Sequence, residues 1–338
     1  MKEYLKQFTV LKKCYHFLMH TYNTFFITQR RISNQVFEYN KKRFFKYSGA
    51  FRDSKVKDLS YLTWLYHVIE KGLAMPNMRL GFGHDKIVEL YYLINTDMKR
   101  YGISKSVTDA VSVLKEYKRV HENANYRLPS DIMKILEDIS TTFADIKPMN
   151  QTEVTKEEYY SSINKDFKEF SMSRHSVRNF SGSVSLDDIK KAIDLAHYCP
   201  SACNRQPVRV HIVSDPKLKN ECLKLQNGNR GFGYLADKLL IMTGDLSTVL
   251  GGQEFFDLGN QVGIFTMNLC YALHYYRIAH CVLNWYAMPS QDKQLRKLLN
   301  IPDEETIFSY IVCGDTPEKF KIVMSPRVPA SQIYTVHQ

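Results

Sequence analysis

The segment Tyr198-Cys199-Pro200-Ser201-Ala202-Cys203-Asn204-Arg205-Gln206-Pro207 decides how the C-terminal half of the chain is interpreted. It ends an amphipathic run with helical spacing and leads directly into the β-rich run at 208–213. Its small residues allow a flat ring to come close, and the Asn204 and Gln206 amides can both donate and accept hydrogen bonds. Taken alone, the segment also fits an ordinary turn that terminates a helix.

A second segment, Ser173–Phe180, lies earlier in the chain and carries Arg174, Ser176 and Arg178 at a short bend. Guanidinium groups make bidentate, charge-assisted bonds to phosphate, and a serine hydroxyl adds a neutral donor. The segment is therefore a candidate anion site, although an exposed basic turn has the same composition.

Around these segments, β-rich runs alternate with helical ones. The β-rich runs are 208–213, 238–243, 280–285 and 307–314, and the helical runs are 186–198, 216–225, 255–276 and 290–299. This alternation predicts an α+β domain. The run at 255–276 is apolar or small on nearly every face, so we expect it to be buried in a large core or against a partner subunit.

Taken in order, these segments resemble the nitroreductase family. The family's R-R/H-S-x-R opening is matched at 174–178 and its P-S-x-x-N-x-Q-P segment at 200–207. The remaining matches are the Asp-led helix from Asp257, the Trp-containing stretch at 281–285, the L-x-I-P-x-x-E element at 299–305, the Gly…Pro-Glu element at 314–318 and a closing Arg327. The resemblance covers residues 173–338, about half of the chain.

The resemblance implies an FMN-binding domain with a mixed or antiparallel sheet flanked by helices, in a homodimer with FMN at the interface. The phosphate and ribityl chain would be held by Arg174, His175, Ser176, Arg178 and Arg327. The isoalloxazine ring would be lined by the segment that contains Pro200, Ser201, Ala202, Asn204 and Gln206, and its edge would be approached by Leu283, Asn284 and Trp285 from the partner.

The implied activity is the two-electron reduction of a small organic acceptor by a ping-pong mechanism, with NADH or NADPH as the reductant. The flavin performs the chemistry in such enzymes, so no side chain need act as a nucleophile. Two other hypotheses stay open. One is a flavin-dependent dehalogenase or dehydrogenase in a biosynthetic pathway, or an enzyme that breaks down the flavin itself; the other is a non-catalytic flavin-binding module.

Residues 1–145 are expected to form a mostly α-helical extension, with helical periodicity at 58–74, 85–100, 106–121 and 129–143. The polar stretch at 146–172, which starts without clear periodicity, is taken as the linker to the flavin domain at 173–338.

The loop at 72–83, rich in glycine, is the most informative part of this extension. Lys71, just before it, and Arg79, within it, are candidate substrate residues that could face an anionic ligand, so the loop is a candidate cap over the flavin pocket. A packed connection between two helices is an equally good interpretation. His67 and Glu70 share a helical face, and a structural role is favoured for them over an acid–base or metal role.

Charge and cysteine content bound the class of protein. The net charge is +11, and the basic clusters Arg30-Arg31 and Lys41-Lys42-Arg43 stand among aromatic residues. Single-stranded nucleic acid could bind such a segment, but amphipathic helices with a solvated basic face are favoured.

The sequence contains no apolar run of membrane-spanning length and no secretory signal. Seven dispersed cysteines, with Cys199 and Cys203 lacking partners at zinc spacing, predict free thiols in the cytoplasm and no metal site.

Overall fold

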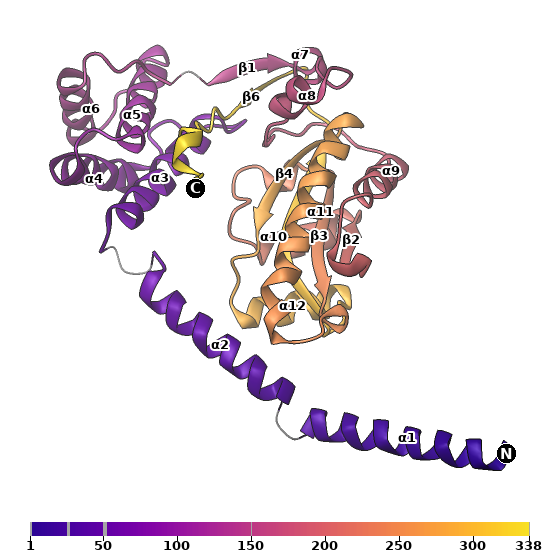
Figure 1. The fold of residues 1–338 in the computed structure, drawn as a ribbon. Helices are drawn as coiled ribbons and strands as arrows, with labels where there is room; N and C mark the ends of the chain where they lie inside the picture. Colours follow the sequence, from indigo (N-terminus) through magenta and orange to yellow (C-terminus); the bar gives the residue numbers. More distant parts are fainter. Residues whose placement is uncertain (1, 26–27, 50–52, 150, 338) are drawn as a thin grey trace.

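The computed structural model describes residues 2–25, 28–49, 53–149 and 151–337, and its N-terminal half is helical (Figure 1). The helices are α1 (Lys2–Phe25), α2 (Thr28–Tyr47), α3 (Lys55–Leu73), α4 (His84–Tyr101), α5 (Lys105–Asn123) and α6 (Ser130–Thr142). The helices predicted at 58–74, 85–100, 106–121 and 129–143 are confirmed. Helices α3 to α6 pack around one core, because each presents an apolar stripe such as Leu62, Leu65, Ile69 and Leu73 of α3.

The C-terminal half is built on an antiparallel sheet in the order β2-β3-β5-β4. Its strands are β2 (Val208–Val213), β3 (Lys238–Asp245), β4 (Ala279–Asn284) and β5 (Glu305–Gly314). Its helices are α9 (Leu186–Ala196), α10 (Pro216–Lys224), α11 (Phe255–Tyr275) and α12 (Pro289–Leu299). The short 3-10 turns are η1 (Ala202–Asn204), η2 (Gly233–Leu235), η3 (Leu246–Thr248), η4 (Gly252–Glu254) and η5 (Ala330–Gln332).

Side-chain alternation along β3 gives the sheet a core on each face. Leu239 and Ile241 pack with residues of α10 and α12, whereas Leu240 and Met242 pack with residues of α9 and α11. The α+β fold class predicted from the alternation of β-rich and helical runs is confirmed.

The segment expected to be a linker, 146–172, is largely folded. It contains β1 (Thr152–Thr155), α7 (Lys156–Tyr160) and α8 (Phe167–Ser173), and β1 pairs antiparallel with β6 (Lys319–Ile322) near the other end of the chain. Tyr159 and Tyr160 are buried in the core of the C-terminal domain. Local composition did not reveal this, because the strand's partner is supplied by a segment far away in the sequence.

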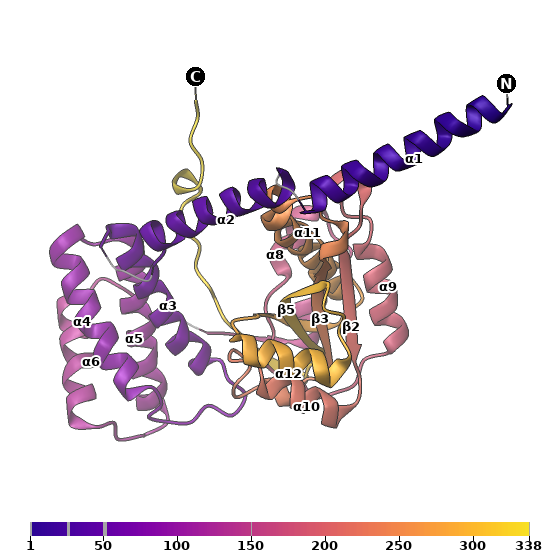
Figure 2. The ribbon, with the colours of Figure 1, turned by 90° about the horizontal axis from the view of Figure 1, so that it is seen from below.

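Helices α1 and α2 form an arm outside the helical bundle (Figures 1 and 2). Helix α2 contacts the turn before α11, where the Gly252 N–H donates to Ser33 Oγ over 3.0 Å and the Phe37 and Phe255 rings meet edge to face at 5.4 Å. Helix α1 extends away from both lobes, with Leu11 and Phe17 exposed. Within the described ranges, no helix is long and apolar enough to cross a membrane.

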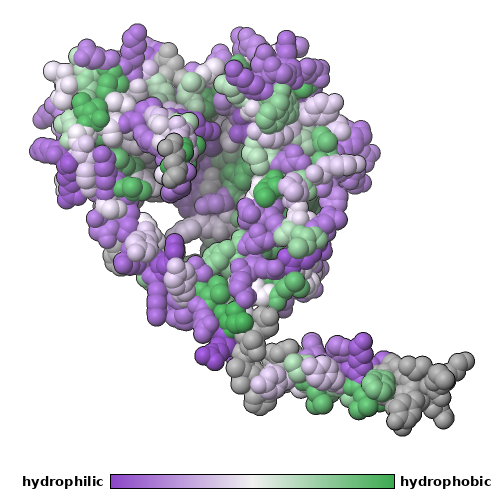
Figure 3. All heavy atoms as spheres, in the orientation of Figure 1, coloured by the Kyte–Doolittle hydropathy of each residue, from purple (hydrophilic) through white to green (hydrophobic). Residues whose placement is uncertain are grey.

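The lobe of α3 to α6 and the C-terminal domain are separated by a hollow on the face shown in Figure 3. The chain that follows β6 leaves the C-terminal domain and passes beside α3, as both ribbon views show (Figures 1 and 2). Residues 323–327 therefore lie where the two lobes approach each other.

Candidate functional site

The bend that carries the arginines is held against the end of α11 and the start of β4. Ser173 Oγ lies 2.8 Å from His274 Nε2, and the Val177 N–H donates to the His280 carbonyl over 2.9 Å. These contacts fix the backbone of the segment on both sides of Arg174, so its side chains are presented from a rigid base.

Four cations converge on this bend from separate parts of the chain. Burial, followed by the charges of Arg174 and Arg327, lowers the pKa of His175. Burial, followed by the charge of Arg178, lowers the pKa of Lys71. The Arg178 guanidinium also lies over the Phe232 ring, 5.9 Å from its centroid. Lys71, Arg174, Arg178 and Arg327 are called the cationic cluster below.

Within the described ranges, the cationic cluster has no carboxylate partner. Among the described residues, none of its members has an Asp or Glu oxygen within 4.0 Å. Arg178 donates to the Ser176 carbonyl over 3.4 Å and Arg327 to the Ser325 carbonyl over 2.5 Å, while Arg174 Nε is buried without a hydrogen-bond partner in the described part of the chain. Converging cations with unused donors are the arrangement that a phosphate group satisfies.

Ser176 and Cys281 of β4 lie beside the cluster. Burial raises the pKa of the Cys281 thiol, while the charge of Arg178, a hydrogen bond with the Ser176 side chain and the charges of Lys71 and Arg174 oppose that shift. Ser176, Arg174, Arg178 and Lys71 therefore all lie near the Cys281 thiol, so the predicted serine donor is close to two of the predicted arginines.

The candidate ring segment, residues 200–206, is a strained turn at the other end of α11. The Ala202 N–H donates to Gln261 Oε1 over 2.9 Å, and the Gln206 N–H donates to Ser201 Oγ over 3.2 Å. Cys203, Asn204 and Gln206 have φ angles of 51°, 56° and 50°. Non-glycine residues with positive φ are uncommon, and their concentration points to a functional constraint on this turn. Pro200, which precedes it, is exposed.

One chain does not bring the ring segment to the cationic cluster. Ala202 is fixed to Gln261 and Ser173 contacts His274, and both attachment points lie on α11. At 1.5 Å per residue they are about 20 Å apart along the helix. A single chain therefore carries two half-sites near opposite ends of α11.

The stretch Leu283-Asn284-Trp285 belongs with the cationic half-site. It continues β4 beyond Cys281, so it lies on the same chain as the cluster, whereas the resemblance implied a contribution from the partner. Leu283 is buried in the core, leaving its backbone to reach a ligand, and the Asn284 carbonyl accepts from Gln226 Nε2 over 2.9 Å. The Trp285 ring stacks on Tyr310 at 5.1 Å.

The two candidate residues at the loop 72–83, Lys71 just before it and Arg79 within it, lie in different surroundings. Lys71 joins the cationic cluster, whereas Arg79 is exposed and has no ion pair within the described part of the chain. Gly81 and Gly83 have φ angles of 73° and 77°, and a Cβ at Gly72 would lie 2.1 Å from the Phe82 ring. The glycines are therefore required by the backbone path and by close packing.

Two residues beside the cluster were not among the sequence candidates, namely Phe232, whose ring lies under the Arg178 guanidinium, and Cys281, whose thiol pKa responds to the charges of the cluster. They are ordinary apolar residues, and only the folded chain shows what they touch. Glu70 was considered only with His67, and its 2.7 Å contact with His67 Nδ1 fits the structural role that was favoured.

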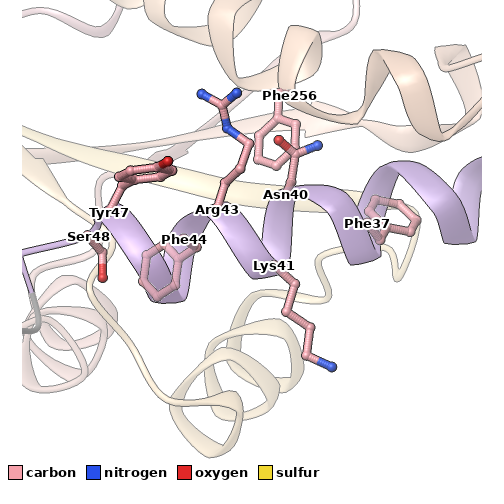
Figure 4. Close-up of a pocket in the computed structure, with 8 residues that line it drawn as sticks. All are labelled: Phe37, Asn40, Lys41, Arg43, Phe44, Tyr47, Ser48 and Phe256. Atoms are coloured by element: carbon pink, nitrogen blue, oxygen red, sulfur yellow. The ribbon is translucent and has the colours of Figure 1, made fainter.

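A separate cavity of about 510 Å³ lies between α2 and the start of α11 (Figure 4). It is lined by Phe37, Asn40, Lys41, Arg43, Phe44, Tyr47, Ser48 and Phe256. All of them except Phe256 of α11 belong to the basic and aromatic stretch considered for nucleic acid. Since Phe37 packs on Phe255 of α11, part of the aromatic face of α2 serves to dock the arm.

Residues 172–239 match the model of the nitroreductase family. The matched range includes both the arginine bend and the ring segment, so the resemblance seen in the sequence is confirmed there. The C-terminal domain thus carries a nitroreductase family segment on an α+β scaffold. No curated protein matches the chain.

Solved structures are similar to the C-terminal half. A nitroreductase family protein from Streptococcus pneumoniae is 22% identical, with 51% of this chain and 100% of that chain covered and a TM-score of 0.45. A nitroreductase family protein from Clostridium difficile 630 is 23% identical, with 51% and 99% covered and a TM-score of 0.42. An FMN-dependent nitroreductase from Clostridium difficile R20291 is 18% identical, with 45% and 89% covered and a TM-score of 0.40.

Proposed function

We propose that this chain is an FMN-dependent oxidoreductase of the nitroreductase type. The observation that carries the proposal is the cationic cluster, which has no carboxylate partner among the described residues and converges on a segment that matches the family. Arg174, Arg178 and Arg327 would bind the cofactor phosphate, with Ser176 as a neutral donor. Bound FMN would supply two-electron hydride chemistry, while the protein positions it and excludes water.

The proposal includes a homodimer, because the exposed face of α11 is apolar. Phe256, Ile264 and Met267 are 58%, 37% and 40% exposed, and a Cβ at Gly263 would meet no atom within 4 Å. Two α11 helices that cross antiparallel along this face would place the Gln261 end of one beside the His274 end of the other. Each cationic half-site would then meet the partner's ring segment, and two complete sites would form.

The residues of the proposed site have distinct tasks. Burial and the charges of Arg174 and Arg327 lower the pKa of His175, so it is neutral at pH 7 and adds no further charge beside the phosphate. The Asn204 and Gln206 amides would form hydrogen bonds with the polar edge of the ring. NADH or NADPH and a small organic acceptor would use the open face of the ring in turn. Free cysteines at all seven positions fit the cytoplasm as the compartment.

Flavin titration of the full-length protein tests the proposal. We expect FMN to saturate the protein with a change in flavin fluorescence, and the Arg174→Ala/Arg178→Ala variant to bind FMN at least 100-fold more weakly, since two charge-assisted contacts are lost. Riboflavin, which lacks the phosphate, should bind both proteins alike. A wild-type protein that FMN cannot saturate would contradict the proposal.

Rapid mixing of the FMN-loaded protein with NADH or NADPH separates a reductase from a flavin-binding module. We expect one of the two nucleotides to bleach the flavin absorbance within seconds, and an acceptor to restore it. Absorbance that neither nucleotide changes would favour the binding module and contradict the reductase.

A further inference from the structure

The end of α3 contacts the C-terminal segment that carries Arg327. Glu70 is fully buried, and its Oε1 accepts a hydrogen bond of 2.8 Å from the Ser325 N–H. Its other oxygen lies 2.7 Å from His67 Nδ1. The Glu70 carboxylate therefore holds the backbone two residues before Arg327 and is already engaged on both oxygens.

The loop after α3 contacts a second part of the cationic half-site. Met75 packs against the core of the C-terminal domain, and a Cβ at Gly231 would lie 3.5 Å from its sulfur. Gly231 has a φ of +87° and precedes Phe232, whose ring lies beneath the Arg178 guanidinium. Met75 therefore packs next to Gly231, the residue that precedes the Phe232 ring on which the Arg178 guanidinium lies.

Lys71 lies in the chain between these two contacts, so the α3 end presents it to the cationic cluster. Its side chain is half-buried, and Arg178 and Cys281 lie close enough to shift the pKa of its ammonium group. The neighbouring Glu70 is occupied by Ser325 and His67, and no described carboxylate lies within 4.0 Å of the Lys71 ammonium group. Two positive charges thus face each other across the junction of the domains.

We propose that Lys71 is a phosphate ligand which the helical domain supplies to the flavin site, so that phosphate binding and domain docking are coupled. The inference rests on the proposed function for the identity of the ligand. A phosphate dianion between Lys71 and Arg178 replaces their repulsion with two attractive contacts, one to each domain. Since such coupling is reciprocal, the bound phosphate stabilises the docked helical domain to the same extent that docking strengthens phosphate binding.

The test compares Lys71→Met with Lys99→Met, which removes the same charge from an exposed position on α4. Fluorescence titration of the full-length proteins with FMN and riboflavin gives the affinities. We expect Lys71→Met to weaken FMN about tenfold or more and to leave riboflavin unchanged, and Lys71→Arg to restore most of the FMN affinity. Lys99→Met should match the wild type for both flavins.

Unchanged FMN affinity in Lys71→Met, or an equal loss of FMN and riboflavin, would overturn the inference, because a phosphate ligand discriminates between them. If circular dichroism shows that Lys71→Met does not fold, Lys71→Gln takes its place with the same expectations. Limited proteolysis adds a second readout. FMN should slow cleavage between α6 and β1 in the wild type but not in the Lys71 variant, and equal protection of both proteins would contradict the coupling.

Inorganic phosphate separates this inference from the proposed function. We expect millimolar phosphate to raise the thermal midpoint of the wild-type protein, and of Lys99→Met, by more than that of Lys71→Met. If FMN fails to bind while phosphate still shows this Lys71-dependent shift, the proposed function is wrong and the Lys71 anion site stands. If FMN binds and neither ligand depends on Lys71, the inference alone is wrong.

Discussion

At the scale of single residues, burial and a neighbouring arginine keep two histidines of the site neutral. His274 and His280 are fully buried beside Arg174. Burial, followed by the charges of His280 and Arg174, lowers the pKa of His274 to about 3, and burial with the charge of Arg174 lowers the pKa of His280 to about 4. The positive charge of the site therefore comes from Lys71 and the arginines and not from these two histidines.

The buried histidines predict acid destabilisation. An unfolded histidine has a pKa near 6.5. Below that pH, His274 and His280 are therefore protonated in the unfolded chain but stay neutral in the folded chain, which favours unfolding. Stability is fully present above about pH 6.5 and is lost as the pH falls toward about 4. At pH 5 each histidine should cost about 2 kcal/mol.

Urea denaturation at pH 7.5 and pH 5 measures this loss. His274→Gln retains an amide in reach of Ser173, and His280→Asn retains one in reach of the Ile278 carbonyl, so the double variant is a matched control. It should lose about 4 kcal/mol less than the wild type between the two pH values. A double variant as acid-sensitive as the wild type would show that these histidines are not responsible.

At the scale of elements, α11 organises the proposed site, because it buries one face against the sheet, holds a half-site near each end and leaves its other face open.

A charge on the open face of α11 should break the dimer. We expect Met267→Glu to make the protein monomeric by light scattering and to abolish tight FMN binding, although Met267 belongs to neither half-site. Val88→Glu, at an exposed apolar position on α4, is the control and should change neither property. A dimeric Met267→Glu protein would argue against this interface.

The sequence predicted those elements whose signal is local. The helix at 186–196 and strand β3 were visible from periodicity, and the arginine bend and ring segment were visible as motifs. Strand β1 was not, because its pairing with β6 depends on residues far away in the chain. For the same reason the sequence could not place Lys71 in the cluster and leave Arg79 outside, since that depends on how Glu70 and Met75 dock.

At the scale of the whole molecule, the arm is attached where α2 meets the turn before α11. A Cβ at Gly252 would lie 2.6 Å from the Ser33 Cα, so a larger residue must push α2 away. We expect Gly252→Val to speed tryptic cleavage within α2 several-fold. Gly49→Val, where a Cβ would meet no atom within 4 Å, should be cleaved like the wild type. Equal cleavage of all three proteins would mean that α2 does not dock there.

The central claim at this scale is that one flavin site is assembled from two chains, since the two half-sites lie about 20 Å apart along α11 of a single chain. The claim can be tested with two variants that each damage one half-site. Arg174→Ala/Arg178→Ala removes the cationic half, and Ala202→Trp fills the ring half. Neither variant alone should bind FMN tightly.

Mixing the two variants, with reversible dissociation to exchange their subunits, tests the claim most directly. About half of the dimers are then mixed, and in each of them one site combines two undamaged half-sites, so tight FMN binding should return at about a quarter of all sites. If each chain instead forms its own site, every site in the mixture still contains one mutated half-site. An exchanged mixture that binds no more FMN than the separate variants would contradict the two-chain site.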